Sequence, residues 1–140
     1  MHQYNQNRLF AASCISLLLT AMTFAIRVRL ETVFGPDGMG LSLEQIGYAF
    51  MPAFWGFTLA IILGGQLVDN IGMKKGMWLA FICHAIGITL TLTAYDFSSL
   101  FVATVIMGLG NGMVEAVCNP LVASMYPLEK TKMLNRYHLR

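Results

Sequence analysis

Four long stretches of this chain contain no Asp, Glu, Lys or Arg, and they constrain the fold more than any other feature of the sequence. They are Leu9–Ile26 (18 residues), Gln45–Val68 (24), Gly76–Tyr95 (20) and Phe97–Val114 (18). An apolar helix needs roughly 17–25 residues to cross the hydrocarbon core of a bilayer. Each stretch reaches that length, so the sequence predicts four transmembrane helices.

The composition argues against the soluble classes of protein. Hydrophobic residues make up 56% of the 140 residues and charged residues only 11%, whereas soluble domains carry about 25% charged residues. We therefore expect no soluble enzyme, nucleic-acid-binding module or disulfide-rich secreted domain. The predicted fold class is an all-α membrane protein with spans at about 9–30, 45–68, 76–95 and 98–126. Its three cysteines lie in apolar stretches without metal-ligand spacing, so we expect reduced thiols, no metal and no cofactor.

The basic residues predict the orientation in the membrane. If the N-terminus is cytoplasmic, seven of the nine Lys and Arg residues fall in cytoplasmic segments, and only Arg27 and Arg29 lie on the outer side. Cytoplasmic loops of membrane proteins carry an excess of Lys and Arg. We therefore expect a multi-pass protein of the cell membrane (plasma or bacterial inner), with both ends of this chain in the cytoplasm.

Local signals indicate the ends of the first two helices. Arg27 and Glu31 stand four residues apart on one helical face, which extends the first helix to about Phe34 and places Arg27 at the outer membrane edge or in a wet cavity. A loop rich in Gly and Pro follows. Ser42 and Gln45 have the spacing of a capping box, so the second helix begins there.

Two turns join the remaining helices. The second helix is expected to run through Pro52 to a tight reversal at 64–76, where Gly72 adopts a backbone conformation that other residues disfavour. A short turn at 96–98 links the third and fourth helices, and Pro127 with the charged residues after it ends the fourth. Connections this short make consecutive helices antiparallel neighbours.

A carboxylic acid near the bilayer midplane is the most informative residue. If the fourth helix spans 98–126, Glu115 lies three residues from its centre, about 4–5 Å at 1.5 Å per residue. A charge there costs on the order of 2.5–3.5 kcal/mol. Asn111 and Asn119 lie four residues before and after it, so the three side chains form one polar row. The row is interpreted as a hydrogen-bonding wall for a polar solute, with Glu115 able to take up a proton. The alternative is that it holds neighbouring helices together.

Two further features of the apolar helices are expected to serve packing. Gly108, Gly112 and Ala116 form a row of small residues that favours close approach of another helix. His84, half-way along the third helix, is interpreted as a packing or hydrogen-bonding residue, with a proton relay as the alternative.

Two motifs resemble the major facilitator superfamily of transporters. Gly65-x-Leu67-x-Asp69-x-x-Gly72-x-Lys74 is similar to the loop between the second and third helices of that family. Glu115-Ala116-x-x-Asn119-Pro120 resembles the fourth helix of its fucose:proton symporter branch. The resemblance implies twelve helices in two six-helix halves, which alternate access to a midplane site. This chain would supply the first two-thirds of one six-helix half.

The resemblance also implies roles for particular residues. Gly65, Asp69, Gly72 and Lys74 belong to the cytoplasmic gate, while Glu115 is the protonatable carboxylate and Asn119 contacts a sugar hydroxyl. The fucose symporter has an acidic residue in its first helix, where this chain has Arg27. Arg27 is therefore expected either to bind an anionic or hydroxylated solute or to lie at the interface paired with Glu31. An aromatic residue of the second helix, Trp55, is the candidate for stacking on a sugar ring, the alternative being a lipid-facing position.

The leading hypothesis is the N-terminal fragment of a secondary transporter for a sugar or similar small polar solute. It is not expected to be an enzyme. Its partners are the solute, the bilayer, the missing C-terminal remainder and, if the transport is coupled, protons; symport, uniport and antiport remain open. Two alternatives stand beside it: a complete four-helix exporter that dimerises, and a non-transporting membrane scaffold.

Overall fold

The computed structural model describes residues 5–139, and its secondary structure is helical. Six helices follow one another, with no β-strand among the described residues: α1 (Gln6–Phe34), α2 (Leu43–Phe50), α3 (Pro52–Ile71), α4 (Met73–Leu92), α5 (Phe97–Met125) and α6 (Lys130–His138). Four helical segments are long and apolar enough to cross a membrane: α1, α2 together with α3, α4, and α5. The predicted all-α fold class with four membrane helices is confirmed.

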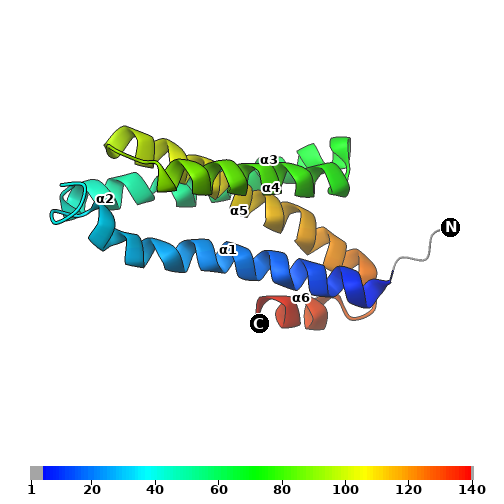
Figure 1. Ribbon diagram of the computed structural model, residues 1–140. Helices are drawn as coiled ribbons and strands as arrows, with labels where there is room; N and C mark the ends of the chain where they lie inside the picture. The colour runs from blue at the N-terminus through cyan, green and yellow to red at the C-terminus, as the bar shows by residue number, and fades with distance from the viewer. Residues whose placement is uncertain (1–4, 140) are drawn as a thin grey trace.

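The bundle is built around α5. In its most apolar window 72% of the residues are buried, against 17% in the corresponding window of α1. Figure 1 shows α3 and α4 lying together along α5, while α1 runs along the opposite side of the bundle. Little of α1 is buried in this arrangement, because only a narrow face of it contacts α5.

Glycines bring α3 and α5 into close contact. A Cβ atom on Gly108 would lie 2.9 Å from the Cα of Ala53, and one on Gly112 would lie 2.6 Å from the Cβ of Ala60. Real Cβ atoms essentially never approach other atoms so closely, so the contact requires glycine at both positions. The packing role expected for the small-residue row of the fourth helix is confirmed.

The second membrane segment is interrupted at Met51, where the sequence predicts one continuous helix. Pro52 has no N–H to donate to the preceding turn, and it begins α3 as its first residue. The hydroxyl of Thr104 on α5 donates to the carbonyl of Ala49 at this break. A buried hydroxyl thus compensates for a backbone group near the interruption.

The turn between α3 and α4 is shorter than the sequence predicts. Helix α3 continues to Ile71 and α4 begins at Met73, so Gly72 alone forms the reversal, with φ +85°. The special conformation expected for Gly72 is confirmed. At the other end of the bundle, Asp96 caps α5: its carboxylate accepts a hydrogen bond of 2.8 Å from the backbone N–H of Ser99. This bond, with the hydroxyl of Ser99, lowers the pKa of Asp96.

Helix α6 was not expected, because the sequence after Pro127 is charged. It folds back beside α1 and α5 (Figure 1), and it buries Met133 and Tyr137 against Val117 and Cys118 of α5. Tyr137 is fully buried, and this burial raises its pKa well above the usual value of a phenol. A buried aromatic anchor on one face explains how so polar a segment forms a helix against the bundle.

Candidate functional site

Arg27 is buried without a hydrogen-bonding partner. Its side chain projects from α1, its exposed fraction is 7%, and none of its three guanidinium nitrogens has a hydrogen-bond partner in residues 5–139. Its central carbon lies 4.6 Å from the centroid of the Phe24 ring, a cation–π contact that offsets part of the lost hydration. The expected pairing of Arg27 with Glu31 is wrong, since Arg27 makes no salt bridge within the described chain and its side chain is buried.

A cavity of about 180 Å³ lies beside Arg27. Its walls come from α1, α2, α4 and α5 and are mostly apolar, with three threonine hydroxyls among them: Thr23, Thr91 and Thr104. The hydroxyl of Thr91 already donates to the carbonyl of Gly87 on its own helix, and that of Thr104 to the carbonyl of Ala49 on α2. The guanidinium is therefore the strongest donor available to a molecule in this cavity.

Glu115 and Asn119 form a pair on α5. The amide nitrogen of Asn119 donates to Oε2 of Glu115 over 2.8 Å, and Glu115 is only 8% exposed. The amide oxygen of Asn119 is buried and accepts no hydrogen bond from the described residues. The pair thus offers one unused acceptor and one ionisable carboxyl group in the interior of the bundle.

Asn111 belongs to a separate network, although the sequence places it in one row with Glu115 and Asn119. Its side chain is fully buried and bonds to Thr23 of α1 at 3.0 Å and to Nε2 of His84 of α4 at 2.7 Å. It therefore joins three helices, and it does not meet Glu115. The hydrogen-bonding role expected for His84 is confirmed.

Trp55 lies away from these groups. It is 64% exposed on α3 and lines a shallow groove with residues of α3 and α5, such as Leu59 and Phe101. That groove includes none of Arg27, Glu115 and Asn119. Trp55 therefore lies on the outer surface of the bundle.

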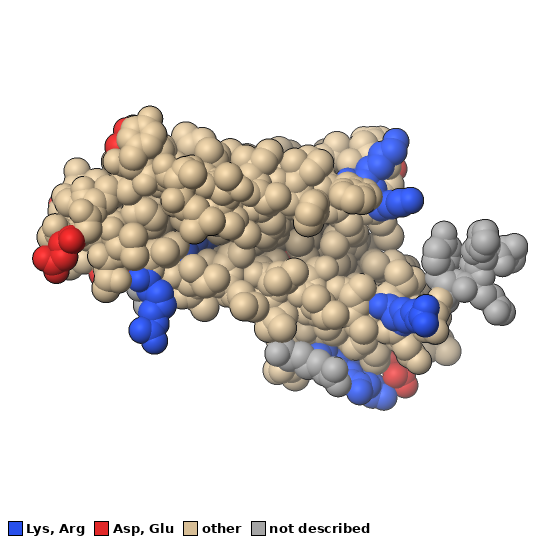
Figure 2. Space-filling view, viewed as in Figure 1, with Lys and Arg blue, Asp and Glu red and all other residues tan. Residues whose placement is uncertain are grey.

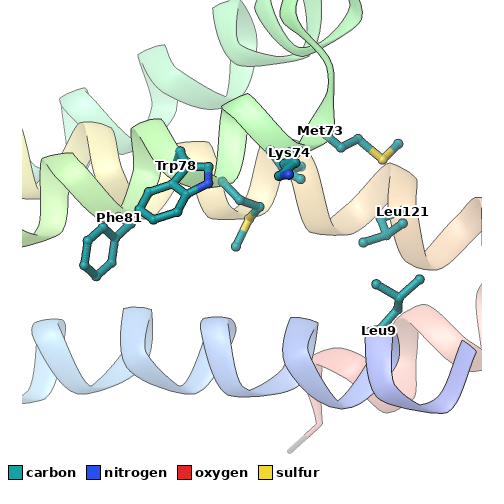
Figure 3. A pocket seen from close by; sticks show the side chains of 8 residues that line it. Leu9, Met73, Lys74, Trp78, Phe81 and Leu121 are labelled. Atoms are coloured by element: carbon teal, nitrogen blue, oxygen red, sulfur yellow. The ribbon is translucent and has the colours of Figure 1, made fainter. Parts of the chain in front are cut away.

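The loop motif lies at one end of the bundle. Gly65 and Asp69 are exposed on the last turns of α3, Gly72 forms the reversal, and Lys74 is exposed on the first turn of α4. Asp69 makes no salt bridge within residues 5–139. Lys74 borders an apolar groove of about 730 Å³ between α1 and α4; Figure 3 shows Leu9 of α1 across this groove from Met73 and Trp78 of α4.

Comparison with known proteins identifies the family. The sequence pattern of the Major Facilitator Superfamily matches residues 8–139, almost the whole chain. The chain belongs to the Major Facilitator Superfamily. It is therefore a multi-pass membrane protein of a transporter family rather than an enzyme, and the alternative of a separate four-helix exporter is not supported.

Two curated proteins that are similar to this chain are named as transporters. The chain is 28% identical to the hexuronate transporter of Bacillus subtilis (strain 168) over 94 residues, 67% of this chain and 22% of the relative. It is 30% identical to "Putative metabolite transport protein YyaJ" of the same organism over 88 residues, 63% of this chain and 20% of the relative. The matched segment thus covers about a fifth of each relative. No solved structure matches.

Two polar residues in the interior of this protein were not predicted as site residues. Thr23 lies in an apolar run with no motif around it, and nothing in the sequence indicates that it meets Asn111. Thr104 likewise has no signal except its place in a membrane helix. Both became recognisable only when the packing of α1, α2 and α5 placed their hydroxyls against groups distant in the sequence.

Proposed function

We propose that this chain forms the N-terminal part of a secondary transporter that moves a small hydroxylated organic acid, of the acid-sugar type, across the cell membrane by alternating access. The observation that carries the proposal is Arg27, a buried arginine whose three guanidinium nitrogens have no partner in residues 5–139. The name of one relative, a hexuronate transporter, supports the same class of solute.

The guanidinium provides the affinity for an acid. Arg27 lies seven residues beyond the middle of α1, about 10 Å along the helix axis, and an arginine in a membrane helix is costly, about 2.5–3.5 kcal/mol at the helix centre on insertion scales. A carboxylate removes that cost, because it neutralises the charge and accepts two parallel N–H donors in the fork geometry of arginine. The cavity beside Arg27, with its three threonines, supplies a small and mainly apolar space for such a group.

The hydroxylated part of the solute is assigned to the Glu115–Asn119 pair. The amide oxygen of Asn119 accepts from a solute hydroxyl, and Glu115 takes up and releases the proton. Met107, which lines the Arg27 cavity, and Glu115 are eight residues apart on α5, about 12 Å along the helix axis. A small solute therefore contacts Arg27 and Glu115 in succession as the protein changes state.

The gate of this transporter is assigned to the loop motif of Gly65, Asp69, Gly72 and Lys74, on the cytoplasmic side. Figure 2 shows that most of the Lys and Arg side chains in view gather at the end of the bundle that holds the α3–α4 turn, the start of α1 and α6. The positive-inside rule favours a cytoplasmic position for this end. Asp69 is exposed there and free to pair with another part of the transporter.

A neutral sugar is the second candidate solute. The unused oxygen of Asn119 favours it, as does the Glu115-Ala116-x-x-Asn119-Pro120 motif, which resembles that of the fucose:proton symporter branch. A neutral sugar leaves the charge of Arg27 uncompensated, which is why the acid is the preferred solute.

The test compares two arginines of α1 in the complete transporter that contains this chain, reconstituted in lipid vesicles. Arg27→Gln should weaken the binding of a hexuronate roughly 10- to 100-fold, since a charge-assisted hydrogen-bonded pair is worth about 1.5–3 kcal/mol. Arg29→Gln is the matched control, because Arg29 is exposed on the same helix, and it should bind like the wild type. Binding is measured by displacement of radiolabelled hexuronate, with a neutral hexose in parallel.

Two outcomes would overturn the assignment. If Arg27→Gln and Arg29→Gln bind the hexuronate equally well, Arg27 does not recognise the acid. If the wild type binds the neutral hexose and not the hexuronate, the second candidate replaces the first.

A further inference from the structure

Both ring nitrogens of His84 face oxygen atoms. Nδ1 lies 2.8 Å from the carbonyl oxygen of Ala80, and Nε2 lies 2.7 Å from Oδ1 of Asn111. A backbone carbonyl only accepts, so Nδ1 must carry a hydrogen. If Oδ1 of Asn111 also accepts, Nε2 carries a second hydrogen and the ring is an imidazolium.

Asn111 permits a second arrangement of the same heavy atoms. Turning its terminal amide by half a turn exchanges the oxygen and the nitrogen with little change of shape. The amide then donates to Nε2 of a neutral ring, and its oxygen accepts from the hydroxyl of Thr23, 3.0 Å away. In the charged arrangement that hydroxyl instead accepts from Asn111 and donates to the carbonyl of Thr20 over 2.8 Å. One proton therefore reverses a chain of hydrogen bonds through α4, α5 and α1.

The surroundings allow His84 to exchange a proton. The ring is half-buried and lines a cavity of about 360 Å³ between α1 and α4, whose other walls are mainly apolar. The ionisable residues on the packed faces are Cys83 beside it on α4, Arg27 one turn beyond Thr23 on α1, and Glu115 one turn beyond Asn111 on α5. No carboxylate in residues 5–139 bonds to the ring directly, so the orientation of the Asn111 amide is the local contact that distinguishes the charged ring from the neutral one.

We propose that His84 is a second proton-binding site of the bundle, whose protonation sets the direction of the His84–Asn111–Thr23 hydrogen-bond chain. The chain ties α4 to α5, which carries Glu115, and to α1, which carries Arg27. The proton-binding part of this inference stands on the geometry alone. Its consequence, that the charge of His84 biases the α1–α5 contact during transport, rests on the proposed function.

Nitrogen NMR of ¹⁵N-histidine in the complete transporter in lipid vesicles, from pH 5 to 9, tests the proposal without solute or gradient. The signals of His84 are assigned by their loss in His84→Gln. We expect both nitrogens protonated at the acid end and the uncommon neutral tautomer with hydrogen on Nδ1 at the alkaline end. A histidine that only fills space does not require this tautomer. A ring that stays neutral throughout, or carries its hydrogen on Nε2, overturns the proposal.

Two threonine substitutions of the same kind test the coupling. Thr23→Val removes the hydroxyl that accepts from Asn111 in the charged arrangement and donates to it in the neutral one, so the pH at which His84 loses its second proton should differ from that of the wild type. Thr89→Val is the control, because the Thr89 hydroxyl is exposed on α4 and bonds to its own helix at Ala85; it should leave the titration unchanged. Asn111→Asp should keep the imidazolium to a pH at least about one unit higher, since a carboxylate favours the charged ring. Equal titration in Thr23→Val and Thr89→Val would show that no such chain exists.

Discussion

Replacement of Gly108 by alanine should destabilise the bundle, although alanine is the better helix former. The added Cβ atom would meet three atoms of Ala53, all in the backbone: the carbonyl oxygen, and the carbonyl carbon and Cα at 2.9 Å. No rotation of a side chain relieves such a contact, so α3 and α5 must separate. Overpacking costs about 1–3 kcal/mol, and the contact with rigid backbone places Gly108→Ala in the upper part of that range.

The intrinsic preference of the helix acts in the opposite direction. Alanine is favoured over glycine by about 1 kcal/mol within a helix, which leaves a net loss of about 1–2 kcal/mol. Gly47→Ala is the matched control: Gly47 lies in α2, and a Cβ atom there would have no neighbour within 4 Å. That variant should gain about 0.5–1 kcal/mol. The two identical substitutions should therefore differ by about 2 kcal/mol, roughly 30-fold in the unfolding equilibrium.

The assay is reversible unfolding of the complete transporter in mixed detergent micelles, followed by tryptophan fluorescence at a single pH and temperature. The midpoint should fall for Gly108→Ala and stay or rise for Gly47→Ala. Equal midpoints for the two variants would refute the reasoning, because they would mean that α3 and α5 tolerate a methyl group between their backbones.

Two predictions concern protons. Asp96→Ala should increase hydrogen exchange in the first turn of α5 at pH 7. The hydrogen bonds of the cap lower the pKa of Asp96. The cap therefore stabilises the helix fully above the usual carboxyl pKa of about 4, and this stabilisation is lost as the pH falls through the lowered pKa. The difference from the wild type should thus disappear in acid, and a difference independent of pH would contradict the cap as its cause. Glu115→Gln should keep solute exchange in counterflow and lose accumulation driven by a pH gradient, because an amide does not take up or release a proton in this pH range. Accumulation equal to that of the wild type would show that Glu115 only holds helices together.

Much of the fold could be predicted because its signals are local. Uninterrupted apolar runs indicate membrane helices wherever they occur, since backbone groups in a bilayer must bond within the helix. The cap at Ser42 and the reversal at Gly72 also follow from a few neighbouring residues, and both are present. By contrast, the break at Met51 was missed because Pro52 fits equally within a kinked helix and at the first position of a new one. Helix α6 was missed because its stability comes from Tyr137, buried against residues far away in the sequence.

The sequence by itself determined the membrane class, the four apolar helices and the membership of the superfamily. Only the tertiary structure decided which polar side chains meet. Residues four apart on a helix are offset by about 40° around its axis, so Asn111 and Asn119 differ by about 80°. That angle lets Asn111 meet α1 and α4 while Asn119 bonds to Glu115. The same holds for Arg27. Its spacing from Glu31 in the sequence fits a surface ion pair, but α2, α4 and α5 pack around its side chain and bury it.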